Sequence, residues 1–224
     1  MAKYEIKDGV GIIPDGVKVI ENDAFKKCAE LKSIVIPDSV TKIGYDAFYD
    51  CAGLASIVVS EGNKVYDSRN GCNAIIETAT NRLIVGCKNT IIPNSVTAVG
   101  DYDVEWGIEM AAFRGCTGLT SIVIPESVTE IGGAFRGCTG LKSISILGPV
   151  KKLRDIVFTG CTALETVTFG ACIKKIEEKH VFADCKGLKV INVPAKKADY
   201  YKSRLPEKLH PLIVELPAEK KVKK

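Results

Sequence analysis

The chain repeats one pattern of apolar positions about every 23 residues. Phenylalanine leads each copy, cysteine follows three residues later, leucine three after that, and two more apolar positions close it. These columns hold Phe25, Phe48, Phe113, Phe135, Phe158 and Phe182; Cys28, Cys51, Cys116, Cys138, Cys161 and Cys185; Leu31, Leu54, Leu119, Leu141, Leu164 and Leu188; and the pairs Ile34/Ile36, Ile57/Val59, Ile122/Ile124, Ile144/Ile146, Val167/Phe169 and Ile191/Val193. Such a period predicts a solenoid, in which each unit buries its apolar side against its neighbours.

The residues after each cysteine predict one short strand per unit. In Leu31–Pro37 the leucine and two isoleucines follow the L-x-x-L-x-L spacing of a strand-forming repeat, and the proline ends the strand because it has no N–H to donate. Val40 and Ile43 then return apolar side chains from the opposite wall, and Asp46–Cys51 closes the unit as a turn or short helical stretch. The predicted fold is mostly β with short helical turns and a parallel sheet on one face.

Two stretches interrupt the period. In Glu61–Thr90, the β-rich runs Asn73–Glu77 and Arg82–Gly86 flank a polar four-residue loop, which predicts a hairpin insertion inside an irregular repeat over 61–90. The second stretch, Asp101–Met110, carries Trp106, the single tryptophan of the chain. A tryptophan on a loop often anchors an interface, so Trp106 is a candidate contact; packing on the flank of the solenoid is the alternative.

The pattern stops after Pro194. Ala195–Arg204 has helical character and Leu212–Leu216 is compatible with a last strand. We assign 195–216 to a C-terminal cap, because the end of a solenoid exposes apolar side chains and unpaired backbone. The predicted domain is thus one solenoid over 1–216, followed by a basic tail over 217–224. From Ala195 onward nine Lys/Arg face four Asp/Glu, so the net charge of +4 belongs to this end of the chain.

Nine cysteines raise the question of disulfides or a metal centre. Stacked strands would set the column cysteines about 4.8 Å apart, beyond the usual Cβ separation of about 3.5–4.5 Å in a disulfide, so we expect free cysteines that pack as small apolar groups. Cys72 and Cys87 lie outside the column and could pair in an oxidising compartment. No C-x-x-C spacing occurs, and His180 and His210 are the two histidines, so the sequence indicates no metal site.

Catalytic motifs are also missing from the sequence. Glu177–His180 brings acidic, basic and imidazole groups together, but neighbours on a turning chain do not converge, so we interpret the run as a solvated turn. Asp101–Gly107 has the acidic spacing of a calcium loop, yet Trp106 and Ala112 occupy the positions that need glycine and glutamate. We therefore expect neither enzymatic activity nor a cofactor.

The strand side chains that alternate with the core columns form the candidate ligand surface. They are Ser33, Val35, Ser56, Val58, Ser121, Val123, Ser143, Ser145, Thr166, Thr168 and Asn192. This set is uncharged, whereas nucleic acid requires Lys and Arg to neutralise phosphates. The surface suits a flat protein partner or a second copy of the chain; a plain solvated sheet is the alternative.

Two strings identify a family resemblance. Ile36–Gly44 and Ala112–Pro125 resemble the BspA-like leucine-rich repeats of bacteria, and the irregular run from Val65 to Thr90 resembles a unit of the gut-anaerobe members. The resemblance implies a leucine-rich-repeat solenoid used for protein binding, often in cell adhesion to host matrix or cell-surface proteins. It names no catalytic residues. A structural or self-associating module without a dedicated ligand is the second hypothesis.

The compartment stays open at this stage. Met1–Lys7 lacks the apolar core of a secretory signal, so the chain as written would be cytoplasmic unless it is a mature or trimmed form. Members of the family it resembles are often at the cell surface or secreted. No stretch approaches the roughly 18 apolar residues of a membrane span.

Overall fold

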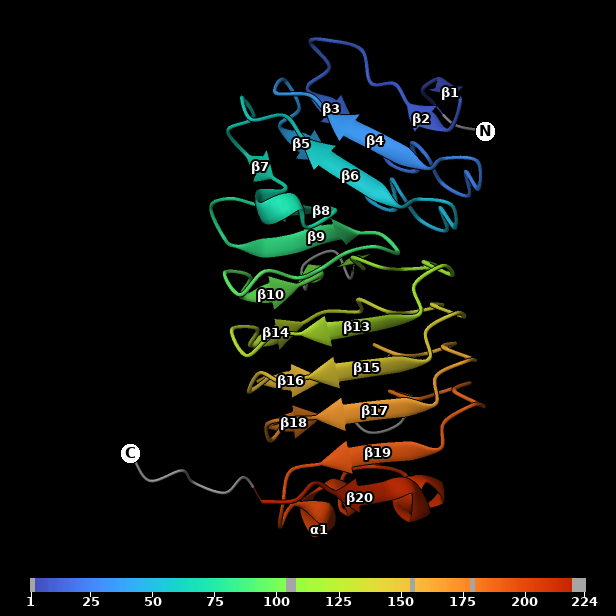
Figure 1. The fold of residues 1–224 in the computed structure, drawn as a ribbon, viewed down its shortest axis with the longest axis vertical. Helices are drawn as coiled ribbons and strands as arrows, with labels where there is room; N and C mark the ends of the chain where they lie inside the picture. Colours follow the sequence, from blue (N-terminus) through green and yellow to red (C-terminus); the bar gives the residue numbers. More distant parts are fainter. Residues whose placement is uncertain (1–2, 104–107, 154–155, 178–179, 219–224) are drawn as a thin grey trace.

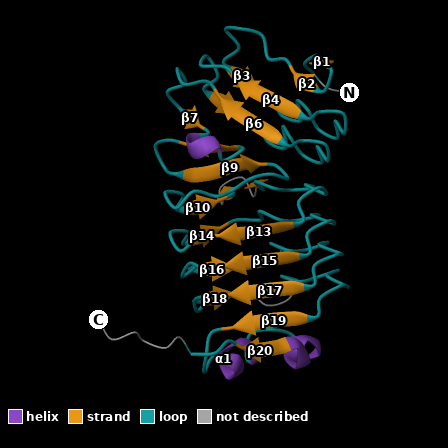
Figure 2. Cartoon of the chain, in the orientation of Figure 1, coloured by secondary structure: helices purple, strands orange, loops and turns teal. Residues whose placement is uncertain are grey.

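Successive units stack along one axis in the computed structural model of the chain, as the apolar columns predict (Figure 1). The structure describes residues 3–103, 108–153, 156–177 and 180–218. Strands occupy the two long walls of the solenoid, and turns join them (Figure 2). The closing stretch Asp46–Cys51, predicted as a turn or short helical stretch, is a hydrogen-bonded turn.

The first wall carries the predicted parallel strands. Each four-residue strand buries its second and fourth residues and turns its first and third outward. They are β4 (Ser33–Ile36), β6 (Ser56–Val59), β13 (Ser121–Ile124), β15 (Ser143–Ile146), β17 (Thr166–Phe169) and β19 (Val190–Val193), extended by β1 (Ile6–Lys7), β2 (Val10–Gly11) and β20 (Ile213–Glu215). The wall consists of two separate sheets, in the orders β1-β2-β4-β6 and β13-β15-β17-β19-β20.

The second wall also forms sheets, which the sequence did not lead us to expect. Each of its two-residue strands ends at the second residue of an inward pair, such as Ile43 of Val40 and Ile43, and two residues are too few to show an alternating pattern. They are β3 (Val19–Ile20), β5 (Lys42–Ile43), β10 (Ala98–Val99), β14 (Glu130–Ile131), β16 (Lys152–Leu153) and β18 (Lys175–Ile176). The longer sheet has the order β18-β16-β14-β10-β9-β8-β7, in which β9 (Arg82–Gly86), β8 (Ala74–Glu77) and β7 (Tyr66–Asp67) come from the irregular repeat, and β3 pairs with β5 alone.

The core consists of the sequence columns stacked in register. Neighbouring phenylalanine rings stack with centroids 5.1–5.8 Å apart, as in Phe113–Phe135 and Phe135–Phe158, which adds to the burial of apolar area. Four of the six column thiols donate to the carbonyl oxygen of the phenylalanine one unit back: Cys51 to Phe25 (2.9 Å), Cys138 to Phe113 (2.9 Å), Cys161 to Phe135 (3.1 Å) and Cys185 to Phe158 (3.1 Å). Cysteine therefore fills the column with a small side chain and satisfies a backbone acceptor between coils.

The irregular repeat contains the predicted hairpin. β8 (Ala74–Glu77) pairs antiparallel with β9 (Arg82–Gly86), and β7 (Tyr66–Asp67) joins β8. Arg69 follows β7 in a 3₁₀ turn over Arg69–Gly71. Its guanidinium donates to both carboxylate oxygens of Asp67 and to Asn81 Oδ1. This network ties the turn to the loop of the hairpin.

The second interruption is a short antiparallel pair, β11 (Asp101–Asp103) with β12 (Ile108–Met110). Trp106 lies outside the described residues, so its role as a contact stays a prediction.

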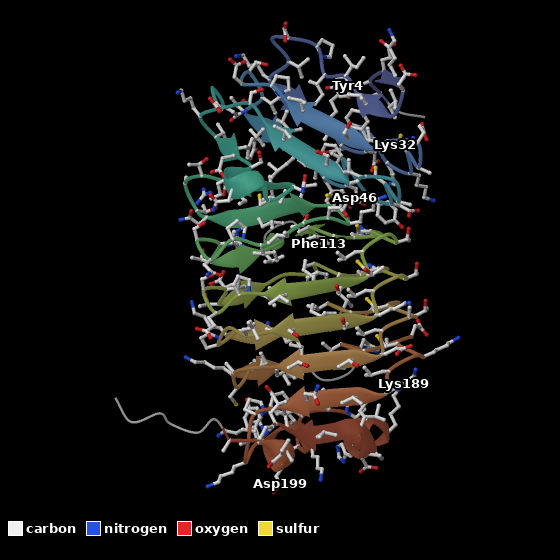
Figure 3. All side chains as sticks on the ribbon, in the orientation of Figure 1. Tyr4, Lys32, Asp46, Phe113, Lys189 and Asp199 are labelled. Carbon is white, nitrogen blue, oxygen red and sulfur yellow. The ribbon has the colours of Figure 1, made fainter. Side chains whose placement is uncertain are left out.

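The units on either side of the irregular repeat meet directly on the turn side of the solenoid. Asp50 N–H donates to Arg114 O at 3.3 Å, and the Arg114 guanidinium donates to Asp46 Oδ2 at 3.0 Å and to the Tyr45 hydroxyl at 2.8 Å. Asp46 and Phe113, both labelled in Figure 3, line the same cavity between these units. Burial raises the pKa of Asp46, although Arg114 acts in the opposite sense.

Both ends of the solenoid are closed. At the N-terminus, Asp8 and Gly9 have φ of 54° and 84°, which is the turn geometry that joins β1 and β2, and Tyr4 stacks on Phe25 at 5.6 Å. The predicted C-terminal cap consists of α1 (Ala198–Lys202), a 3₁₀ helix over Glu207–Leu212 and β20. Tyr201 of α1 is buried and stacks on Phe169 at 5.1 Å. Most of the predicted basic tail, residues 219–224, lies outside the described residues.

Candidate functional site

The candidate site is the outward face, which we define as the side chains of β4, β6, β13, β15, β17 and β19 that point away from the core. Period-2 alternation explains it, because the leucine, isoleucine and valine columns take the inward positions. The structure places every predicted strand residue on this face, half-buried or exposed: Ser33, Val35, Ser56, Val58, Ser121, Val123, Ser143, Ser145, Thr166, Thr168 and Asn192. Their part in binding stays a prediction.

Strand register aligns these side chains in two rows along the solenoid. The first row pairs Ser33 with Ser56 and then, beyond the irregular repeat, Ser121 with Ser143, Thr166 and Val190. The second row pairs Val35 with Val58 and then Val123 with Ser145, Thr168, Asn192 and Val214. Stacking therefore converts a repeat in the sequence into two rows of aligned side chains on each of the two sheets.

The second row changes chemistry along its length. Val35 and Val123 are 50% and 55% exposed, and Ile91 between them is 76% exposed. Beyond Val123 the row is polar through Ser145, Thr168 and Asn192, whose Nδ2 donates to Thr168 Oγ1 at 3.0 Å, and it ends at the exposed Val214. The outward face thus has an apolar part over β4, β6 and β13 and a hydroxyl and amide part over β15, β17 and β19.

Charged side chains border the rows and do not enter them. Lys32 and Lys189 precede β4 and β19, and Figure 3 shows both along the same margin of the solenoid. Lys189 pairs with Glu165 of the neighbouring coil at 3.1 Å, with both side chains largely exposed. An exposed pair of this kind adds little stability, and mixed signs do not form the basic surface that nucleic acid requires.

Two exposed apolar residues next to the face were missed at the sequence level. Cys87–Pro93 matches Leu31–Pro37 position by position, which puts Ile91 at the place of Val35 although the run lies within the irregular repeat. Leu147, 37% exposed, follows β15 where Pro37 and Pro125 follow their strands. Aligning every unit on its terminal proline position would have revealed both.

The thiols are poor candidates for nucleophiles. Burial raises the pKa of Cys51, Cys116, Cys161 and Cys185 to about 12, and that of Cys138 lies well above its usual range for the same reason. The thiolate is the reactive form, so these side chains serve packing. Cys72 and Cys87 are both buried free thiols, and their Sγ atoms approach the carbonyl oxygens of Ala74 (3.8 Å) and Asn73 (3.3 Å).

The acidic and imidazole run does not form a cluster within the described part of the chain. The Glu177 carboxylate pairs with Lys152 of the preceding coil, and His180 starts the turn after it; Glu178 and Lys179 lie outside the described residues. Residues 3–103, 108–153, 156–177 and 180–218 contain no group of three or more His, Cys, Asp or Glu side chains that could hold a metal ion. No helix in these ranges is long and apolar enough to cross a bilayer.

Comparison with solved structures identifies similar solenoids. A leucine-rich cell surface protein from Faecalibacterium prausnitzii aligns with a TM-score of 0.63 and 28% identity over 93% of this chain and 53% of its own. A leucine-rich repeat protein from Eubacterium ventriosum aligns with a TM-score of 0.50 and 29% identity over 71% of this chain and 48% of its own. The chain thus spans about half the length of these two proteins.

A family model describes most of the sequence. The model of the BspA type leucine-rich repeat region matches residues 11–102 and 107–205 in six copies. No curated protein matches the chain. The matched ranges contain the stacked columns, both walls and the outward face, and they continue through the irregular repeat. The chain belongs to the BspA-type leucine-rich repeat family.

Proposed function

We propose that the chain is a non-enzymatic, protein-binding scaffold of the adhesion type, which presents its outward face to a partner protein. The observation that carries the proposal is the pair of uncharged rows, in which Val35, Val58 and Val123 are exposed at the same position of their strands on one wall. Isolated exposed apolar residues are ordinary, but a contiguous apolar surface bordered by polar residues is typical of interaction sites. The face is also held by a rigid stack of coils, so binding orders few side chains.

The class of partner follows from the same chemistry. Hydroxyl, amide and small aliphatic groups suit a protein surface, whose own interfaces are about as apolar as the rest of its exterior. The relatives with similar structures include a cell surface protein, and matrix or cell-surface proteins are the partners that the family resemblance suggests. We therefore propose extracellular protein as the ligand.

The test is direct binding to purified matrix and cell-surface proteins, measured by biolayer interferometry. Val58→Arg and Ser145→Arg each place a long charged side chain in one half of the outward face, and we expect at least one to weaken binding tenfold or more. Thr41→Arg makes a comparable change on the second wall, where Thr41 is exposed, and should bind as the unaltered chain does. Equal binding by all variants would refute the outward face as the contact.

Self-association is the alternative function, since the exposed valines of the same face would serve a second copy equally well. Sedimentation velocity over a wide concentration range separates the two functions. A monomer at every concentration excludes self-association, whereas a dimer that Val58→Arg dissociates supports it.

A further inference from the structure

The first wall is interrupted between β6 and β13. In regular units, the first outward residue donates its backbone N–H to a carbonyl of the preceding unit at 3.1–3.4 Å; these donors are Ser33, Ser56, Ser143, Thr166 and Val190. Ser121 occupies the same position in β13, and within the described residues its N–H has no such backbone partner. β13 pairs with β15 on one side only.

The cause lies in the segment that precedes β13. Thr90 stands in the inward column where the regular units have isoleucine or valine, and its hydroxyl donates to Asn73 O at 2.7 Å. The next residue, Ile91, donates its N–H to Cys72 O at 3.1 Å. Both bonds tie the segment to the turn before β8, and it does not form a strand beside β13.

A groove lies between this segment and β13. Its volume is about 720 Å³, and Ile91, Ile92, Ile122, Val123 and Leu147 line it together with polar residues that include Ser121. That volume is in the range of about 300–1,000 Å³ found for small-molecule ligand pockets. The groove is therefore bordered both by exposed apolar side chains and by the edge of β13 that pairs with no other strand.

The backbone of Val123 points its N–H into the groove. In β15, the outward residues donate toward β13, because Ser143 N–H bonds Thr120 O and the residue after the strand, Leu147, bonds Ile124 O. In a parallel ladder the same positions of successive strands point their N–H groups the same way. Thr120, Ser121 and Val123 thus present N–H groups to the side that lacks a strand.

The two ends of β13 carry opposite charges. Glu126 is exposed just beyond its C-terminal end and lines the groove. Lys88 lies at the other end, with its side chain beside Gly118. An extended segment running parallel to β13 would meet this pattern with an acidic residue at its N-terminal end and a basic residue at its C-terminal end.

We infer that the groove binds an extended peptide segment of a partner protein, which adds to β13 as a parallel strand. Backbone hydrogen bonds to Thr120, Ser121 and Val123 would supply affinity, and pockets for alternate side chains would supply selectivity, as in other cases of strand addition. Small apolar side chains would pack on Ile91 and Leu147. This inference deepens the proposed function, on which it rests, by naming the form of the partner.

The test uses a seven-residue peptide with capped ends, in which valine and threonine alternate between an N-terminal glutamate and a C-terminal lysine. Fluorescence anisotropy measures its affinity, and amide hydrogen exchange by NMR locates it. Without peptide, the amides of Ser121 and Val123 should exchange faster than those of Ser143 and Ser145. Saturating peptide should slow Ser121 and Val123 at least tenfold.

Val123→Pro removes the N–H that faces the groove and leaves the bonds to β15 in place, because proline is tolerated where no ladder bond is lost. We expect it to weaken peptide binding at least tenfold, whereas Val123→Thr, which keeps the N–H and the branched side chain, should bind normally. If Val123→Pro does not fold, the same test is made on the unaltered chain with peptides that are N-methylated at alternate residues. Methylation of the peptide N–H groups that face β13 should abolish binding.

Three results would overturn the inference: no binding of the peptide at millimolar concentration, unchanged affinity of the methylated peptides, or equal protection of Val123 and Ser145 in the free protein. Ser145→Arg separates this inference from the proposed function. It alters the outward face but not the groove residues, so it should leave peptide binding intact. If Ser145→Arg loses binding to the partner protein but the peptide binds to neither the variant nor the unaltered chain, the groove inference is refuted and the proposed function stands.

Discussion

Leucine side chains at two positions of one unit offer a sharp test of the stacking. Leu141 is fully buried between coils, and Leu147 is 37% exposed six residues later. Leu141→Ala removes three carbon groups from the core, which costs about 2.4 kcal/mol at roughly 0.8 kcal/mol per group. A rigid cavity adds about 24 cal/mol per Å³ that the neighbours do not fill. We therefore expect the free energy of unfolding to fall by about 3–4 kcal/mol.

Leu147→Ala is the matched control, since it is the same substitution in the same unit. Its side chain is already partly in water and leaves no closed cavity, so the loss should be about 1.5 kcal/mol. Urea unfolding followed by far-UV circular dichroism, with reductant present, measures both. The slope of the free energy of unfolding against urea concentration must be the same for both variants and the unaltered chain, because a solenoid can unfold in parts. Losses within 1 kcal/mol of each other would refute the assignment of inward and outward positions.

Two further predictions concern buried charge. Arg114→Met should lower the free energy of unfolding in urea by about 1.5–3 kcal/mol, because it leaves the nearly buried Asp46 carboxylate without its charged donor. Adding Asp46→Asn to this variant should recover part of the loss. A further loss of stability in the double variant would contradict the pairing. Burial alone would raise the pKa of Asp67, but the hydrogen bonds from Arg69 hold this pKa below its usual value. The Asp67 carboxylate therefore adds to the free energy of unfolding at pH values above its unfolded pKa of about 3.9. This contribution disappears as the pH falls through the folded pKa. Unfolding of Asp67→Asn and the unaltered chain, compared from pH 7 to pH 2, should show a stability gap that closes in acid; a gap that is constant or widens would count against this.

The regular part of the fold could be predicted from the sequence because its columns recur with one period. Phe135, Cys138 and Leu141 are all fully buried, as expected when each unit covers the next. The hairpin β8–β9 was also predictable, since a polar loop separates two β-rich runs. The N-terminal hairpin was overlooked, although Asp8-Gly9 between short apolar runs is a strong local turn signal.

The second wall and the groove were not predictable from the period. Lys42–Ile43 and its equivalents are strands only because the neighbouring coil offers hydrogen bonds, and two residues carry no alternation. The groove exists because Thr90 and Ile91 donate hydrogen bonds to the carbonyl oxygens of Asn73 and Cys72 in the irregular repeat. The segment therefore does not pair with β13. Sequence spacing alone puts Ile91 in line with Val35 and so suggests continuous pairing.

The repeat and its interruption have different consequences for binding. Repeated units stacked in register align their outward side chains in rows, and a partner that contacts only the recurring positions could bind one unit further along at little cost. The irregular repeat removes that degeneracy, because it replaces isoleucine by Thr90 at one inward position, draws the backbone away from β13 and exposes Ile91. One unpaired strand edge then sits at a single place along the solenoid. A scaffold built this way has a broad face for contact area and one fixed point that can set the register of its partner.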